Sequence, residues 1–371
     1  MKAKKIIRII LRIILVIFLL LFLTVLSYFL YMYIAYYRLD DLLVLNVNNK
    51  GNSKGAVTTD TTYSIMTFNI GYGAYEDDYS FFMTGGKYSW AFSKERLKSN
   101  MDGMANDIKG VHSDFVMLQE VDVDGTRTYH FDELFFLETQ LGYSNYVYAQ
   151  NYDSPFLFYP FLEPHGSNKA GILTATSFNI TESIRRSLPI ATNINKFLDL
   201  DRCYSISQIP VDNGKNLTLI NLHLSAYGGN ASIRENQVKL LSQDMEREIE
   251  VGNYVIVGGD FNHNLRVGNY TDYPDWAQQF PRDALPTNTT FAFEIAKINN
   301  TDHNSARSNS KPYEKDVTFT VLLDGFIVSS NVEVEYNESL DWEFKRSDHD
   351  PVYMKFKLKQ KNKKTQGLFN N

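Results

Sequence analysis

The longest apolar stretch of the chain lies near its N-terminus, where no charged residue occurs from Ile13 to Tyr37. A helix rises about 1.5 Å per residue, so this stretch is long enough to cross a hydrocarbon layer of roughly 30 Å. Tyrosines crowd its C-terminal end, as they do in the aromatic belt at a membrane surface. The pattern therefore predicts one transmembrane helix over residues 13–37.

The charges on either side of this stretch predict its orientation. Five basic residues precede it, whereas Arg38, Asp40 and Asp41 follow it without a basic excess. Because cytoplasmic flanks carry the excess of Lys and Arg, we expect residues 1–12 in the cytoplasm and the rest outside a single-pass cell membrane protein. A cleaved signal peptide would have a shorter apolar core ending at small residues, and bulky aromatics stand there instead.

Beyond this helix the apolar runs are short. Residues 38–60 are polar and rich in Gly and Asn, which predicts a linker. Helices are predicted at 93–109, with Ser93 as N-cap, and at 231–250, because apolar residues recur there on one face. Apolar runs that predict strands occupy residues 63–70, 114–120, 143–150, 170–176, 217–224, 253–260, 317–328 and 351–358. Since helices and strands alternate only in places, we expect an α/β domain with mixed sheets in layers.

Several predicted strands end in a carboxylate, an amide or an imidazole. The residues at these ends are Asn69, Glu120, His223, Asp260 with Asn262, Asp324, and Asp348 with His349. One such residue is usually explained by a turn or by packing. Six such strand ends in one chain indicate a common site, because layered α/β folds gather catalytic groups where rigid strands meet loops.

The composition narrows the chemistry of such a site. The formal net charge is −6, and the basic N-terminal segment leaves the body more acidic still, which disfavours a nucleic-acid-binding body. Cys203 is the only cysteine, which excludes an intramolecular disulfide and a cysteine zinc site. Oxygen ligands without clustered Cys or His favour Mg²⁺ or Mn²⁺ over zinc, and Glu120 is the best first ligand.

The same blocks, in the same order, resemble the endonuclease/exonuclease/phosphatase superfamily, which includes deoxyribonucleases, abasic-site endonucleases, inositol-phosphate phosphatases and neutral sphingomyelinases. The matching segments are TFNIGYG, LQEV, NLHLSAYG, GGDFNHN, LLDGFIVS and SDHDPV. The resemblance implies a four-layer sandwich of two mixed β-sheets flanked by helices over residues 61–358. A basic polar tail would follow at 359–371.

The resemblance also implies a role for each matching position. Glu120 would hold the metal with support from Asn69, and Asp348 would lie near this metal or a second one. The implied catalytic residues are Asp260, which would activate water, Asn262, which would hold Asp260, His349, which Asp324 would orient against the phosphate, and His223, which would stabilise the transition state or assist the leaving group. Family members differ over which group is base and which is acid, so these roles stay open. Asp350 in SDHDPV departs from the commoner small or polar residue.

Two further residues are candidates for binding the substrate. Arg202 precedes a strand and would reach a phosphate oxygen, and Lys169 lies in a polar segment that relatives keep beside the active site; a structural role is the alternative for both. The apolar, proline-containing run at 155–164 is either a lipid-facing loop or a packed lid.

These observations predict a metal-dependent hydrolase of phosphoesters, with phosphodiesters favoured, that acts outside the cell membrane. A phospholipid headgroup is the expected substrate, because a short tether holds the site near the bilayer. Nucleic acid is the less favoured substrate, as in an extracellular nuclease. A non-catalytic binding module that keeps the fold is the remaining alternative, although every ligand position is filled.

Overall fold

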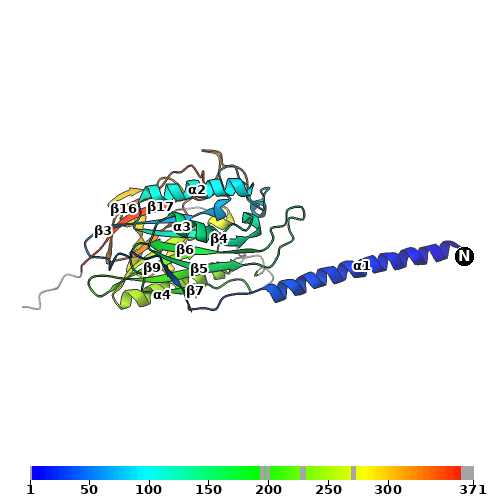
Figure 1. The fold of residues 1–371 in the computed structure, drawn as a ribbon, viewed down its shortest axis with the longest axis horizontal. Helices are drawn as coiled ribbons and strands as arrows, with labels where there is room; N and C mark the ends of the chain where they lie inside the picture. Colours follow the sequence, from blue (N-terminus) through cyan, green and yellow to red (C-terminus); the bar gives the residue numbers. More distant parts are fainter. Residues whose placement is uncertain (1, 193–195, 197–200, 226–230, 269–272, 361–371) are drawn as a thin grey trace, which may run out of the picture.

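Two large β-sheets pack face to face and carry helices on their outer faces (Figure 1). The computed structural model describes residues 2–192, 196, 201–225, 231–268 and 273–360. The predicted basic tail lies outside the described residues from 361 onward. The arrangement confirms the expected four-layer sandwich of two mixed sheets.

One sheet has eight described strands in the order β12-β16-β17-β3-β4-β6-β5-β2. Their bounds are β2 Val47–Asn49, β3 Thr62–Asn69, β4 Phe115–Gly125, β5 Asn145–Asp153, β6 Asn168–Thr176, β12 Ile298–Asn300, β16 Val332–Ser339 and β17 Val352–Leu358. The central strands β3 and β4 are parallel, whereas β4 pairs with β6 and β3 with β17 in antiparallel fashion. The sheet is therefore mixed.

The other sheet has seven described strands in the order β1-β7-β8-β9-β10-β15-β11. Their bounds are β1 Leu43–Val44, β7 Glu182–Ser187, β8 Cys203–Pro210, β9 Asn216–His223, β10 Tyr254–Asp260, β11 Thr289–Phe291 and β15 Asp324–Ser329. Here β9 and β10 are the parallel pair, and β15 runs antiparallel to β10. A short ribbon of β13 Ala306–Arg307 and β14 Thr320–Val321 lies apart from both sheets.

Apolar side chains fill the layers between these elements. Ile65 and Phe115 from one sheet pack with Leu219 and Ile256 from the other, which forms the central core. The outer helices are α2 Lys94–Val111, α3 Glu133–Gln140 and α4 Ala231–Glu250, with a single-turn α5 at Ala292–Ile295. Ser93 caps α2 by accepting a hydrogen bond from the Arg96 backbone N–H, as predicted. The apolar face of each long helix thus covers one sheet.

The strand predictions differ from the structure in three ways. The second strand continues past residue 120 to Gly125, and the single strand predicted at 317–328 divides into β14 and β15. The strands β7 and β16 had not been predicted. Strand β16 alternates apolar and charged residues only in its first half, and β7 has Ile184 as its one apolar residue, so neither contains a continuous apolar run.

The segment that leads into the body is not a simple linker. Within the predicted linker 38–60, β1 adds to the edge of one sheet beside β7, and β2 adds to the edge of the other beside β5. Backbone hydrogen bonds to exposed sheet edges stabilise this polar segment, which its composition alone could not indicate.

Helix α1, Lys2–Ala35, projects from the body (Figure 1). It is long and apolar enough to cross a membrane. It extends the predicted span of 13–37 at its N-terminal end and stops two residues short of it at the other.

Candidate active site

The polar strand ends meet because their strands are aligned in register. Asn69 is paired with Gln119 in the parallel strands β3 and β4, and Asp260 is paired with His223 in the parallel strands β10 and β9. Asp260 also faces Asp324, the first residue of the antiparallel strand β15. The ends of both sheets therefore deliver their polar residues to one edge of the sandwich.

Glu120 reaches this edge through an irregular backbone. The register of β4 against β6 shifts between Leu118 and Val121, and Glu120 in that bulge has φ 58°. A non-glycine residue in the left-handed region costs about 1–3 kcal/mol, and such strain is concentrated at functional sites. The bulge turns the carboxylate of Glu120 into the cavity.

The carboxylate of Asp260 lies at the centre of the site and is held by amides. Asn69 Nδ2 donates to Asp260 Oδ2 at 3.1 Å, and Asn262 Nδ2 donates to the same oxygen at 3.2 Å. The backbone N–H of Asn262 donates to Oδ1 at 2.8 Å. Burial raises the pKa of Asp260 to about 6, although His349 and these donors lower it. Asp260 is thus a rigidly oriented carboxylate of increased basicity.

His349 is oriented by a second buried carboxylate. Its Nδ1 lies 2.7 Å from Asp324 Oδ2, and Ser305 Oγ donates to the same oxygen at 2.8 Å. The other nitrogen, Nε2, lies 3.8 Å from Asp260 Oδ2. Burial lowers the pKa of His349, but the charges of Asp324 and Asp260 outweigh this effect and raise the pKa well above its usual value. The imidazole therefore favours its protonated form.

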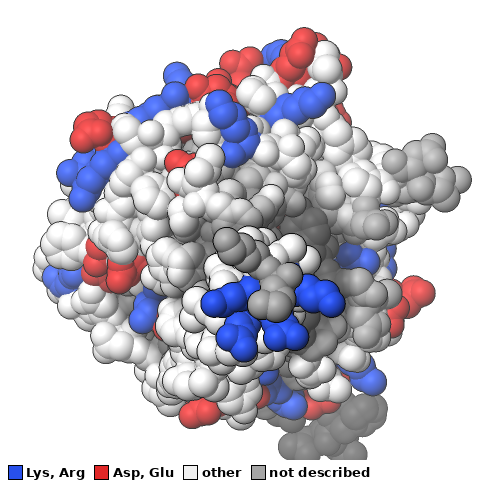
Figure 2. Space-filling view, turned by 90° about the vertical axis from the view of Figure 1, so that its right-hand side faces the viewer, with Lys and Arg blue, Asp and Glu red and all other residues white. Residues whose placement is uncertain are grey.

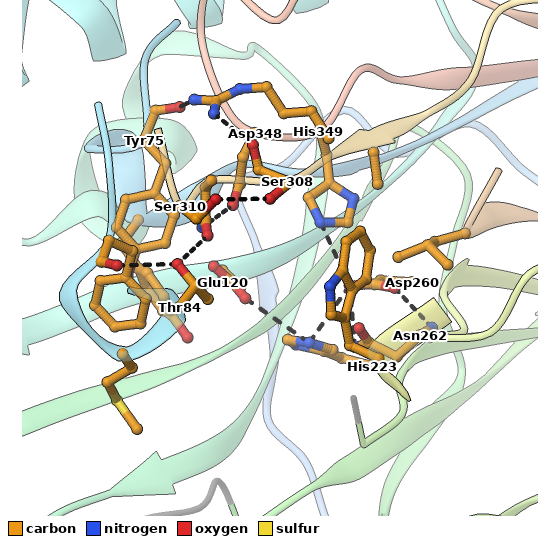
Figure 3. Close-up of a pocket in the computed structure, with 18 of the residues that line it drawn as sticks. Tyr75, Thr84, Glu120, His223, Asp260, Asn262, Ser308, Ser310, Asp348 and His349 are labelled. Carbon is orange, nitrogen blue, oxygen red and sulfur yellow. Dashed lines mark hydrogen bonds and ion pairs between the residues drawn. The ribbon is translucent and has the colours of Figure 1, made fainter. Parts of the chain in front are cut away.

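His223 lies between the carboxylates of Glu120 and Asp260 (Figure 3). Its Nε2 is 3.5 Å from Asp260 Oδ2 and 3.8 Å from Glu120 Oε1. Burial, then the positive charges of Arg202 and His349, lower its pKa well below the usual value. Its buried Nδ1 has no hydrogen-bond partner in the described part of the chain. The pKa values of the two site histidines thus shift in opposite directions, upward for His349 and downward for His223.

Glu120 and Asp348 form a pair of carboxylates that suits a hard cation. The pKa of Glu120 is raised to about 8, first by burial and then by the negative charge of Asp348. Glu120 accepts no hydrogen bond from the described residues, whereas Asn309 Nδ2 donates to Asp348 Oδ2 at 2.6 Å. Both carboxylates line the cavity. A cation bound between the two carboxylates would offset the repulsion between their negative charges, and the oxygens of Glu120 would coordinate it. The oxygen donors present fit Mg²⁺ or Mn²⁺.

A second cluster of possible metal ligands consists of Asp260, Asp324 and His349. Their ligand atoms lie within 4.8 Å of one another. The Nδ1 of His349 is already bound by Asp324. This group therefore fits a hydrogen-bonded catalytic unit better than a set of metal ligands.

The site opens into a cavity of about 530 Å³ that carries three arginines. Arg127 is paired with Asp122 at 2.8 Å, and its guanidinium lies 3.2 Å from the centre of the Tyr72 ring. Arg307 is held by the backbone carbonyls of Tyr75 and Glu76. Arg202 lines the same cavity. The cavity wall thus carries buried cations as well as carboxylates.

The structure brings together most of the predicted site residues but separates one from the rest. Those that line the cavity are Glu120, Arg202, His223, Asp260, Asn262, Asp348 and His349, with Asn69 and Asp324 directly behind them. Lys169 does not line it, and its Nζ lies 3.2 Å from Asp153 instead. Asp350 accepts backbone N–H bonds from Phe344 and binds His303 at 2.7 Å, so it stabilises a turn.

Several residues of the site had not been predicted. Four of them, Arg127, Ser305, Arg307 and Asn309, come from segments without an apolar pattern. The site partners of Ser305 and Asn309 are also far away in sequence. Only Tyr72 had a visible signal, because it lies inside the TFNIGYG block.

Comparisons with known proteins agree with this fold. Residues 66–349 match the family model described as the endonuclease/exonuclease/phosphatase family. An endonuclease/exonuclease/phosphatase from Beutenbergia cavernae superposes with a TM-score of 0.57 at 16% identity, covering 80% of this chain and 72% of that one. A second, from Bacteroides vulgatus, gives 0.53 at 18% identity, covering 81% and 100%.

A third similar structure is the mannosyl-6-phosphatase Bt3783 of Bacteroides thetaiotaomicron, with a TM-score of 0.50 at 15% identity, covering 79% of this chain and 99% of that one. A comparison with curated protein sequences gave no match. At these identities the solved structures support the fold, and the family model carries the assignment.

Proposed function

The chain belongs to the endonuclease/exonuclease/phosphatase family, and from this premise we propose that it is a hydrolase of phosphodiester bonds that depends on Mg²⁺ or Mn²⁺. The observation that carries the proposal is the position of Asp260. Two amides fix its carboxylate beside His223 and His349, opposite Glu120, in one cavity. That arrangement suits attack by an oriented water on a phosphorus atom.

The residues divide the chemistry between them in this proposal. Asp260 orients the attacking water and accepts its proton. The protonated His349, held by Asp324, donates to a phosphoryl oxygen as negative charge develops there. The neutral His223 donates a hydrogen bond from Nε2 to the transition state or to the leaving oxygen.

Glu120 and Asp348 would hold the metal ion, and Asn69 would support it by fixing the adjacent Asp260. When bound, a divalent cation polarises the phosphoryl group and neutralises charge that develops on its oxygens. Arg202 and the other cavity arginines hold the remaining phosphate oxygens by charge-assisted hydrogen bonds.

We further propose that α1 anchors the protein in the cell membrane, with residues 1–12 in the cytoplasm and the catalytic domain outside. The support is the apolar length of α1 and the basic residues that precede it.

The test is hydrolysis of bis(4-nitrophenyl) phosphate and of 4-nitrophenyl phosphate by the full-length protein in detergent micelles. We expect turnover of the diester with Mg²⁺ and none in chelator. Asp260→Asn should lower kcat at least about 100-fold, as loss of a general base typically does. The matched control is Asp102→Asn on the exposed side of α2, which should behave as the wild type. Undiminished turnover by Asp260→Asn, or full activity in chelator, contradicts the proposal.

A further inference from the structure

A loop rich in aromatic residues projects from the body beside the cavity. This segment, residues 156–162, is called the aromatic loop below. Phe161 is 83% exposed and Leu162 is fully exposed. The base of the loop is fixed, since Leu157 bridges to Gly166 and Trp90 Nε1 donates to Pro164 O at 2.7 Å. The apolar tip is therefore held out from the body by a supported stem.

The aromatic loop lies directly against α1. The hydroxyl of Tyr28 donates to the backbone oxygen of Phe156 at 3.1 Å, and the hydroxyl of Tyr31 accepts from the N–H of Phe156 at 3.0 Å. The rings of Tyr28 and Phe158 meet edge to face, with 5.1 Å between their centres. Two side chains of α1 thus form hydrogen bonds with the backbone oxygen and the backbone N–H of Phe156 in the loop.

These contacts set the depth of the aromatic loop relative to α1. Tyr28 precedes the end of the helix at Ala35 by seven positions, which corresponds to roughly 10 Å along the axis. Tyr28 and Tyr31 belong to the tyrosine-rich C-terminal end of the stretch that carries no charge from Ile13 to Tyr37. Because the loop contacts α1 at this level, it is at the height of the bilayer boundary whenever α1 spans a membrane.

The wall of the cavity lies beside the aromatic loop. Phe82 lies between the two features, with its ring 5.8 Å from that of Tyr159 in the aromatic loop and 5.4 Å from that of His165 in the cavity wall. Met83, which also lines the cavity, is 54% exposed. Figure 2 views the side of the body from which α1 projects, with basic side chains at the near end of the helix and a largely uncharged surface behind and around it, interrupted by scattered charged side chains.

We propose that the aromatic loop inserts into the membrane that α1 spans and, as a second contact, holds the cavity against the lipid headgroups. The substrate class that follows is a phosphoester carried by a membrane lipid. This inference rests on the proposed function for its substrate and on α1 for its orientation. Aromatic side chains suit this location, because rings favour the boundary between headgroups and acyl chains.

The first experiment measures insertion without any use of activity. Full-length Leu162→Trp is reconstituted in phosphatidylcholine vesicles, and its fluorescence is compared with and without brominated acyl chains. The matched control is Phe135→Trp, which is 68% exposed on α3 and lies away from the loop. We expect at least about twofold stronger quenching for position 162 than for position 135. Equal quenching at both positions overturns the proposal.

The second experiment measures what insertion does for catalysis. The protein in vesicles is given two chromogenic diesters, methyl 4-nitrophenyl phosphate in solution and hexadecyl 4-nitrophenyl phosphate in the bilayer. We expect the double variant Phe161→Asp, Leu162→Asp to lose at least about tenfold in kcat/KM on the anchored ester and less than twofold on the soluble one. Equal loss on both esters, or loss on neither, overturns the orienting role. Failure of the wild type on both esters would refute the proposed hydrolase instead, and the quenching result would still stand.

Discussion

Replacing Asp324 by Asn tests whether the buried partner of His349 contributes to turnover. The substitution keeps the shape of the side chain and removes its charge. In the structure, Asp324 Oδ2 binds His349 Nδ1 at 2.7 Å and Ser305 Oγ at 2.8 Å. The residue is only 1% exposed, so water cannot replace the lost charge.

The size of the effect follows from the kind of hydrogen bond that is lost. A hydrogen bond to a charged partner contributes about 1.5–3 kcal/mol. Each 1.36 kcal/mol of transition-state stabilisation corresponds to a factor of ten in rate. If the pair holds His349 protonated for the transition state, kcat should fall by about 10- to 150-fold. Because Asp324 lies behind the cavity, KM should change less than about threefold.

The assay is steady-state hydrolysis of bis(4-nitrophenyl) phosphate, with Tm measured on the same samples. Asp244→Asn is the matched control, because Asp244 is also buried and binds Arg186 at 2.9 Å, but on α4 outside the cavity. It should lower Tm while leaving kcat within twofold. A normal kcat for Asp324→Asn in a folded protein, or an equal loss in the Asp244 variant, would refute the reasoning.

Three further predictions concern the metal, the substrate and the membrane. Glu120→Gln should raise the Mg²⁺ concentration needed for half-maximal activity at least about tenfold, because an amide is a poorer ligand for a hard cation; an unchanged metal titration contradicts this. Arg202→Ala should lower kcat/KM at least about tenfold, as loss of a charge-assisted hydrogen bond does. Lys169→Ala removes only the pairing with Asp153, so its kcat/KM should stay within twofold of the wild-type value. A larger loss for Lys169→Ala than for Arg202→Ala would place Lys169 in the site. A tag at the N-terminus should resist protease added to intact cells, while a tag at the C-terminus should be cleaved, and the opposite pattern would exclude the proposed orientation.

Much of the candidate site was predictable from the sequence because the strands that carry it are strongly apolar. Short apolar runs bounded by turn residues are consistent with buried strands. The polar residues that end these runs are then conspicuous, as with Asn69 and His223. Parallel neighbours in a sheet end at one edge, so side chains such as those of His223 and Asp260 meet there once the strands pair.

Other parts of the site depend on contacts that no local pattern records. Ser305 binds Asp324, and Asn309 binds Asp348, from irregular segments. The direction of the Glu120 side chain depends on a bulge in β4, which arises from its pairing with β6. Such positions follow from register and long-range packing, which a single strand does not encode.

By itself, the sequence determined the strongly apolar strands, the polar residues at their ends, and that an apolar helix would precede the body. Burial of apolar segments can be predicted from the local sequence. These features can therefore be predicted without knowing which segments pack against each other. Only the tertiary structure decided that Lys169 pairs with Asp153 away from the cavity, that residues 43–49 join the sheet edges, and that Tyr28 and Tyr31 bind the aromatic loop. Each of these is a directional contact between polar groups on different segments, and its geometry exists only after those segments have come together in the folded chain.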